Sequence, residues 1–211
     1  ADTTADMDNV FNHLASQNRL PRMRRLQVAP FHLHRRTLEK IEQVGLAAQR
    51  GEGGRIVAKM NALTDEAIAH ALVLAGQRGA RIDLIVRGAC ILPAQVPGMT
   101  DNIRVRSIIG RFLAHSMVFY FRCGAEEEHY LSSADWMNRN MMRRVEISWP
   151  ITDPELRQHI IDECLVAYLH DDRDAWELQP GGTYVHAGKP VTGMGAQNAL
   201  MGRYAPSGQK G

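Results

Sequence analysis

Two short apolar runs flank one amphipathic segment in the first half of the chain: Arg55-Ile-Val-Ala-Lys59, then residues 65–78, then Ile82-Asp-Leu-Ile-Val86. The two runs are rich in β-branched and aliphatic residues, which favours strands. Apolar residues recur at helical spacing between them, and Gly79 stands where a glycine C-cap is expected. This order predicts a βαβ unit, in which a helix connects two parallel strands.

The flanking sequence repeats the same kind of pattern. Further strands are predicted at 26–29, 103–108, 117–121, 130–132 and 145–148, and further helices at 33–49 and 153–169. We therefore expect an α/β fold with a mixed, mostly parallel sheet flanked by helices. Residues 181–211 hold eight glycines, which predicts a poorly ordered or extended Gly-rich C-terminal tail.

Composition restricts the class of protein. Apolar residues make up 45% of the 211 residues and charged residues 23%, so the chain can build a core. A net charge of +2 does not indicate a nucleic-acid partner. No apolar run approaches the ~20 residues of a membrane span. Three scattered cysteines without a CxxC pair predict a reduced, cytoplasmic protein, and a start at Ala1 predicts a piece of a longer chain.

Polar side chains follow three of the predicted strands. Lys59 and Asn61 close the first, Arg87 follows the second, and Ser132 and Ser133 follow the strand at 130–132. Ligands of α/β sheets bind at the carboxyl ends of the strands. A cation, an amide and hydroxyls that converge there suit a phosphate group.

His115 precedes the apolar strand at 117–121 and stands about 17 residues before the two serines. This spacing resembles the second half of the HxK…GSxN arrangement of the phospholipase D superfamily, in which imidazoles do nucleophilic and acid work at phosphorus. Met117 takes the place of the motif's Lys, and Asp135 that of its Asn. A lone His beside an apolar strand is more often structural, so this motif leaves both interpretations open. The acidic run Glu126-Glu-Glu128 reads as a solvated turn rather than a metal site.

Longer phrases are more specific than any of these motifs. They resemble the bacterial polyphosphate kinases of the large, ATP-dependent type over nearly the whole chain. The phrases are Val28-Ala-Pro-Phe31, Ala58-Lys-Met-Asn61, Asp83-Leu-Ile-Val-Arg-Gly88, Asp101-Asn-Ile-Arg-Val-Arg-Ser-Ile-Ile-Gly-Arg-Phe-Leu-Ala-His115, Tyr130-Leu-Ser-Ser-Ala-Asp-Trp-Met-Asn-Arg-Asn140 and Arg143-Arg-Val-Glu146.

The resemblance implies a domain plan. In that family two phospholipase-D-like domains follow two N-terminal domains. Residues 26–180 would be the second of them, and 1–25 the tail of the first with a linker. The implied reaction moves the γ-phosphate of ATP reversibly onto polyphosphate through a phosphohistidine that lies upstream of this chain. By resemblance, Arg87 and His115 contact ATP, and His115 is the second catalytic His.

The family also implies cofactors and partners. Mg²⁺ is expected, with ligands outside this chain and no metal site within it. The expected partners are ATP or ADP, polyphosphate, the upstream domains and further copies of the protein, in the cytoplasm, with peripheral association at the inner membrane left open. Family members often have a basic residue where Met117 stands, which leaves a charge contact there in question.

Arginine clusters suggest where polyphosphate runs, because Arg binds phosphate bidentately. Two alternatives to the kinase remain: a phosphodiesterase or nuclease of the phospholipase D type, and a polyanion-binding module without activity of its own. The isolated chain is expected to be inactive as a kinase. The candidates for the polyphosphate path are Arg104, Arg106, Arg139, Arg143 and Arg144.

Overall fold

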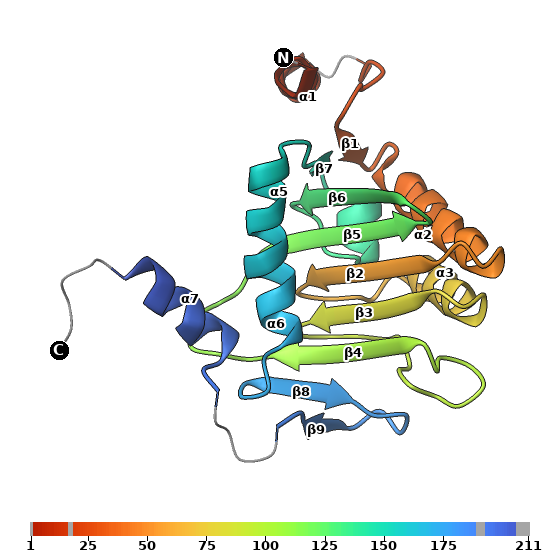
Figure 1. Ribbon diagram of the computed structural model, residues 1–211. Helices are drawn as coiled ribbons and strands as arrows, with labels where there is room; N and C mark the ends of the chain where they lie inside the picture. Colours follow the sequence, from red (N-terminus) through yellow and green to blue (C-terminus); the bar gives the residue numbers. More distant parts are fainter. Residues whose placement is uncertain (1, 17–18, 189–192, 206–211) are drawn as a thin grey trace.

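A computed structural model describes residues 2–16, 19–188 and 193–205. Within these ranges one sheet of nine strands runs through the molecule (Figure 1). In spatial order the strands are β1 (Gln27–Ala29), β7 (Glu146–Pro150), β6 (Glu126–Ser132), β5 (Met117–Cys123), β2 (Gly54–Met60), β3 (Arg81–Val86), β4 (Ile103–Ile108), β8 (Ala175–Leu178) and β9 (Tyr184–His186).

The sheet is mixed, as predicted, but it is not mostly parallel. Only the pairs β2–β3 and β3–β4 are parallel within the described residues, and the other neighbours pair antiparallel. The predicted βαβ unit is the parallel part. β5 and β6 are joined by a tight turn with Gly124 at φ +62°, and a turn this short permits only antiparallel pairing.

The predicted position of this turn was wrong. The acidic run Glu126 to Glu128 was expected to form a turn, but it lies at the start of β6. Glu126 to Glu128 are paired with β5 as regular strand residues and do not form a turn. The predicted strand at 130–132 is only the second half of β6. Charged residues are uncommon in strands, and the tight pairing with β5 overrides that preference.

Helices cover both faces of the sheet (Figure 1). On one face lie α2 (Leu33–Gln49), α3 (Glu66–Gln77) and the short α4 (Asn138–Met142). On the other lie α5 (Pro154–Ile160), the π-helical segment η1 (Ile161–Val166) and α6 (Ala167–Leu169), which continue one another. The predicted helices at 33–49, 65–78 and 153–169 are therefore confirmed, the last with a π-helical centre.

Alternation along the strands divides the core into two layers. In β2, Ile56 and Ala58 pack into the layer under α2 and α3, whereas Val57 packs into the layer under η1 and α6. All three side chains are 5% exposed or less. Side chains at odd-numbered positions of β2 therefore point toward η1 and α6, and Lys59 lies on this side.

Local signals set the ends of the helices. The carboxylate of Asp65 accepts a hydrogen bond from the Ile68 amide at 3.0 Å and caps α3, and Asp153 caps α5 in the same way at Leu156. Gly79 ends the α3 region at φ +98°, as predicted. These caps fix where each helix starts and stops relative to the strand ends.

The C-terminal segment is more ordered than its glycine content predicts. Strand β9 pairs with β8, and helix α7 (Ala196–Tyr204) follows. The side chain of Gln197 holds α7 in place, because it accepts from the Phe112 amide and donates to the Phe112 carbonyl, each at 2.8 Å. These partners lie 85 residues away in sequence, so composition could not reveal them.

At the other end, helix α1 (Asp2–Ser16) is tied to the strand that follows it. The buried carboxylate of Asp6 accepts hydrogen bonds from the amides of Arg24, Arg25 and Leu26 at 2.6–3.0 Å.

Among the described helices, none combines the length and apolar character needed to cross a bilayer.

Candidate functional site

The ends of three neighbouring strands meet at one edge of the sheet. β2 and β3 run parallel and β5 runs against them, so the carboxyl ends of β2 and β3 lie beside the start of β5. Asn61 follows β2, Arg87 follows β3 and His115 precedes β5. The structure therefore brings together Asn61 and Arg87, which were predicted from the strand ends, and His115, which was predicted from the spacing of its motif.

The side chain of Asn61 joins the other two. Its amide nitrogen contacts Nδ1 of His115, and its amide oxygen accepts a hydrogen bond from Nε of Arg87 at 3.0 Å. Because an amide nitrogen can only donate, Nδ1 of His115 is the acceptor, and a neutral ring then carries its proton on Nε2. The exposed imidazole thus presents an N–H group beside a guanidinium, which suits a phosphoryl oxygen.

Asp135 fixes the position of Asn61. Its buried carboxylate accepts from the backbone amides of Asn61 at 2.6 Å and Ala62 at 3.2 Å. The next residue, Trp136, accepts from the amides of Thr64 and Asp65 through its carbonyl oxygen. The loop after β6 thereby braces the loop after β2. The sequence motif gave no hint of this role, because it placed Asp135 only as a substitute for Asn.

Of the two predicted serines, Ser132 is the last residue of β6 and Ser133 follows it directly. Ser132 donates to the Ile147 carbonyl at 3.0 Å and accepts from the Ala134 amide, and Ser133 donates to Glu146 at 2.5 Å. Within the described residues, no hydrogen bond joins either hydroxyl to His115 or Arg87. A phosphate contact from these serines remains a prediction and requires the hydroxyls to exchange partners.

Lys59 lies below the surface of the site rather than on it. It is 3% exposed, its Nζ donates to Oγ of Ser116 at 2.6 Å, and it lies 4.4 Å from the ring centroid of Tyr168. Burial lowers the pKa of its ammonium to about 8, although the nearby Cys164 opposes the shift. Through Ser116 the lysine is linked to the backbone next to His115, a connection that sequence reasoning missed.

Lys59→Met tests this burial through the pH dependence of stability. Unfolded Lys59 keeps its proton up to its ordinary pKa of 10.5, whereas folded Lys59 loses it near pH 8. The unfolded state therefore binds more protons between these values, and Lys59 makes the free energy of unfolding rise with pH across this window. We expect the difference between native and variant protein to change by roughly 3 kcal/mol from pH 7.5 to 10.5, measured by urea unfolding. A pH-independent difference contradicts the low pKa.

Met117 borders the site at the position where a basic residue was expected. Its side chain is 5% exposed, belongs to the core under α2, and its Sδ lies 3.9 Å from the amide nitrogen of Asn61. The sulfur thus packs against the amide that orients His115. It makes an apolar wall where the motif has a charge.

The five arginines of the predicted polyphosphate path are on different faces. Arg106 faces α6, where it donates to the Leu169 carbonyl at 2.5 Å and pairs with Glu177 at 2.8 Å. Arg104 is exposed on the same strand. Arg139, Arg143 and Arg144 are exposed in and after α4, which packs against α2 on the opposite face. A polyphosphate path along one face of the sheet therefore includes either the arginines of β4 or those in and after α4, but not both groups.

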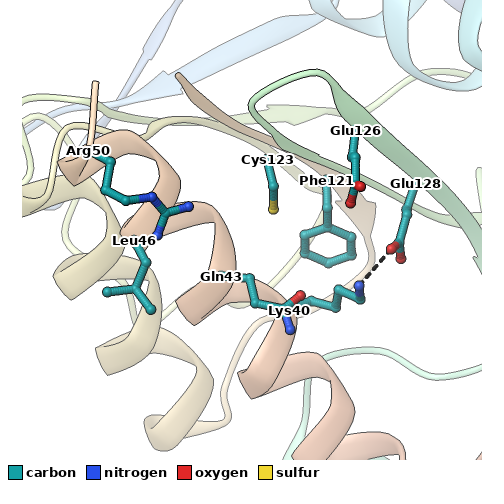
Figure 2. A pocket seen from close by; sticks show the side chains of 8 residues that line it. All are labelled: Lys40, Gln43, Leu46, Arg50, Phe121, Cys123, Glu126 and Glu128. Carbon is teal, nitrogen blue, oxygen red and sulfur yellow. Dashed lines mark hydrogen bonds and ion pairs between the residues drawn. The ribbon is translucent and has the colours of Figure 1, made fainter. Parts of the chain in front are cut away.

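A cavity of about 410 Å³ lies elsewhere in the molecule (Figure 2). It opens between α2 and the end of β5, where Lys40 pairs with Glu128 at 2.6 Å near Phe121 and Cys123. Cys123 ends β5, whereas His115 precedes its start, so about 20 Å of strand separates the two regions. This cavity is therefore separate from the place where Asn61, Arg87 and His115 meet.

The chain matches a known protein family over most of its length. Residues 26–197 match the family model described as polyphosphate kinase C-terminal domain 2. The chain belongs to the polyphosphate kinase family. The polyphosphate kinase of Synechocystis sp. is 49% identical over 180 residues, which cover 85% of this chain and 25% of that protein. That of Burkholderia cenocepacia is 44% identical over 200 residues, or 95% and 29%.

A solved structure of a family member shows the same fold. The crystal structure of polyphosphate kinase from Porphyromonas gingivalis superposes with a TM-score of 0.87 at 34% identity, over 96% of this chain and 32% of that one. The chain thus spans a quarter to a third of these polyphosphate kinases. The predicted family and its α/β domain are confirmed.

Proposed function

We propose that this domain supplies part of the active site of a polyphosphate kinase that transfers the γ-phosphoryl group of ATP reversibly to polyphosphate. The contact of Asn61 with both His115 and Arg87 carries the proposal, because it sets an imidazole N–H beside a guanidinium at a strand end. Residues 26–180 form the catalytic domain in this proposal, and 1–25 end the preceding one.

The transfer proceeds in two steps. A histidine of the preceding domain attacks the γ-phosphorus, so that a P–N bond forms, the bond to the bridging oxygen breaks and ADP leaves. The terminal oxygen of polyphosphate then attacks the same phosphorus and the P–N bond breaks. Nε2–H of His115 assists proton or charge movement at the phosphoryl group, and Arg87 neutralises charge on its oxygens.

The other parts of the site support these two groups. Asn61 orients them, and Lys59 acts from below through Ser116. Ser132 and Ser133 hold phosphate once their hydroxyls exchange their present hydrogen-bond partners for phosphate oxygens. Mg²⁺ would neutralise phosphate charge, but in the described ranges no group of three or more His, Cys, Asp or Glu side chains is arranged to hold a metal. The ligands of Mg²⁺ are therefore proposed to lie in the upstream domains.

ATP or ADP, polyphosphate, the upstream domains and further copies of the protein are the proposed partners, in the cytoplasm. This assignment rests on the polyphosphate kinases that the chain resembles. The chain alone is expected to take no label from γ-labelled ATP, because the proposed nucleophile lies outside it.

Arg87→Gln in the full-length kinase tests the assignment. Removal of one charge-stabilising donor costs about 10²–10³-fold in rate, so we expect a loss of that size in polyphosphate synthesis from ATP and Mg²⁺. Arg35→Gln is the matched control, because Arg35 is exposed on α2 and pairs only with Glu39 there. Full activity of Arg87→Gln contradicts the proposed role of Arg87. Hydrolysis of a simple phosphodiester, without polyphosphate synthesis by the native enzyme, favours the phosphodiesterase instead.

A further inference from the structure

One half of a sheet face carries no covering helix in the described part of the chain. Figure 1 shows α5 and α6 crossing the sheet near the carboxyl ends of β2 and β3, while α2 and α3 lie behind it. None of the described helices crosses the amino-terminal halves of β2, β3 and β4 on the front face. Along these strands, successive side chains point alternately into the core under α2 and α3 and onto the front face. Those on the front face lie outside that core, so its packing does not restrict which residues stand there.

Strand register sets arginines side by side on this open face. Arg55 is opposite Arg122 of β5 on one side and opposite Arg81 of β3 on the other. Neighbouring strands lie about 4.8 Å apart, so the three residues form a row across the sheet. Arg104 of β4 is opposite Asp83, one pleat further along the same face. We call these four arginines the arginine row.

Carboxylates balance only part of this charge. Asp83 pairs with Arg55 and with Arg81, the latter at 3.6 Å. Glu127 is opposite Arg122 in register but accepts from the Tyr120 hydroxyl instead, at 2.8 Å. The four guanidinium groups thus face two carboxylates, which leaves a net charge of +2.

Two members of the row have no partner among the described residues. Neither Arg122 nor Arg104 makes an ion pair or a side-chain hydrogen bond there, and Nε of Arg122 is buried without an acceptor. Like charges directly opposite one another destabilise a sheet, and a buried donor without an acceptor adds to that cost. An anionic ligand on this face would offset the repulsion between the like charges.

The face is also hollowed. A cavity of about 260 Å³ is lined by Arg55, Arg81 and Arg104, with His170 and the Arg106–Glu177 pair at its wall. Arg81 offers a free end to a ligand, since its side chain is 68% exposed. The cavity is distinct from the His115 site, because Arg55 and Lys59 are four residues apart on β2, about 13 Å, and Lys59 lies under Tyr168.

We propose that the arginine row is a second phosphate-chain site, which holds inorganic polyphosphate away from the reacting end. Its ligand class rests on the proposed kinase function. A chain of anions suits a row of cations spaced along a sheet, because each guanidinium can take successive phosphate oxygens bidentately. The site would act on long chains and leave ATP and short oligophosphates to the His115 site.

The test is binding of long-chain inorganic polyphosphate to the 211-residue chain, with tripolyphosphate as the short ligand. We compare native protein with Arg81→Gln/Arg104→Gln and with the control Arg35→Gln/Arg50→Gln, which removes the same charge from α2 and from its C-cap residue. We expect the row variant to lose ~10-fold or more in affinity for the long chain, the control to lose less than ~2-fold, and the salt dependence to weaken only in the row variant. Arg122→Gln alone should lower the affinity in the same direction.

Several outcomes would overturn the proposal. If the row variant and the control lose equal affinity for the long chain, only net charge matters. If the row variant loses as much affinity for tripolyphosphate as for long-chain polyphosphate, the row does not hold a chain. Unchanged affinity in the row variant means that the row is not the site. Thermal unfolding midpoints that match the native protein show that the variants fold. Because this test measures binding and not turnover, its failure is distinguishable from a failure of kinase activity in the Arg87 experiment.

Discussion

His115→Ala is expected to reduce ATP-dependent polyphosphate synthesis by the full-length kinase about 10³-fold, with the fold intact. General acid–base groups contribute about 10²–10⁴-fold to rates, and the Nε2–H of His115 is the proton-bearing group that faces away from Asn61. The ring is exposed, so its loss leaves no cavity in the core. Steady-state polyphosphate formation with Mg²⁺ and ATP measures the effect, and kcat should fall more than KM rises.

His70→Ala is the matched control, because His70 is exposed on α3 and makes no hydrogen bond or ion pair among the described residues. Its activity should equal that of the native enzyme. A His115→Ala variant that keeps more than ~10% of native activity would show that His115 is structural, because general acid–base catalysis contributes at least ~10²-fold.

Asn61→Asp refines the same experiment. A carboxylate only accepts hydrogen bonds, so Asp at position 61 would draw the ring proton of His115 to Nδ1 and leave Nε2 without one. We expect activity to fall while the protein stays folded, and imidazole ¹⁵N shifts should show the exchanged tautomer. An unchanged tautomer means that the Asn61 contact does not set the protonation of His115.

Trp136→Ala should lower the free energy of unfolding by about 3–5 kcal/mol. The side chain is fully buried and packs against Phe119 with ring centroids 4.8 Å apart. Its loss leaves a large cavity beneath the loop after β2, whose amides at Thr64 and Asp65 are bound by the Trp136 carbonyl. Urea unfolding at neutral pH measures the change, and activity should fall with it because Asn61 belongs to this loop.

Trp136→Phe separates packing from hydrogen bonding. The indole Nε1 is buried without a partner among the described residues, so Phe removes an unsatisfied donor while it keeps most of the ring. We expect a cost below about 1.5 kcal/mol. A cost as large as that of Trp136→Ala would mean that the indole N–H is bound in the folded protein.

Local sequence patterns predicted most of the helices and strands and about half of the residues at the candidate site. The βαβ unit, the C-cap at Gly79, the strand-end residues Asn61 and Arg87, and His115 before β5 all follow from local signals of period, turn chemistry and strand position. The predicted start of β6 was wrong, and β9 and α7 form in a segment that was expected to be a poorly ordered or extended tail. Cross-strand pairing and the Gln197 contacts, which cause these differences, join residues that are remote in sequence.

The sequence by itself determined the family, the parallel core of the sheet and the polar residues that end its strands, since these depend on neighbours within a few positions. Only the tertiary structure decided that most strands pair antiparallel, that Asp135 and Lys59 support the site from below, and that Arg55, Arg81 and Arg122 form one row. Strand direction and register are set by turns and by packing between distant segments, so no local pattern encodes which side chains become neighbours.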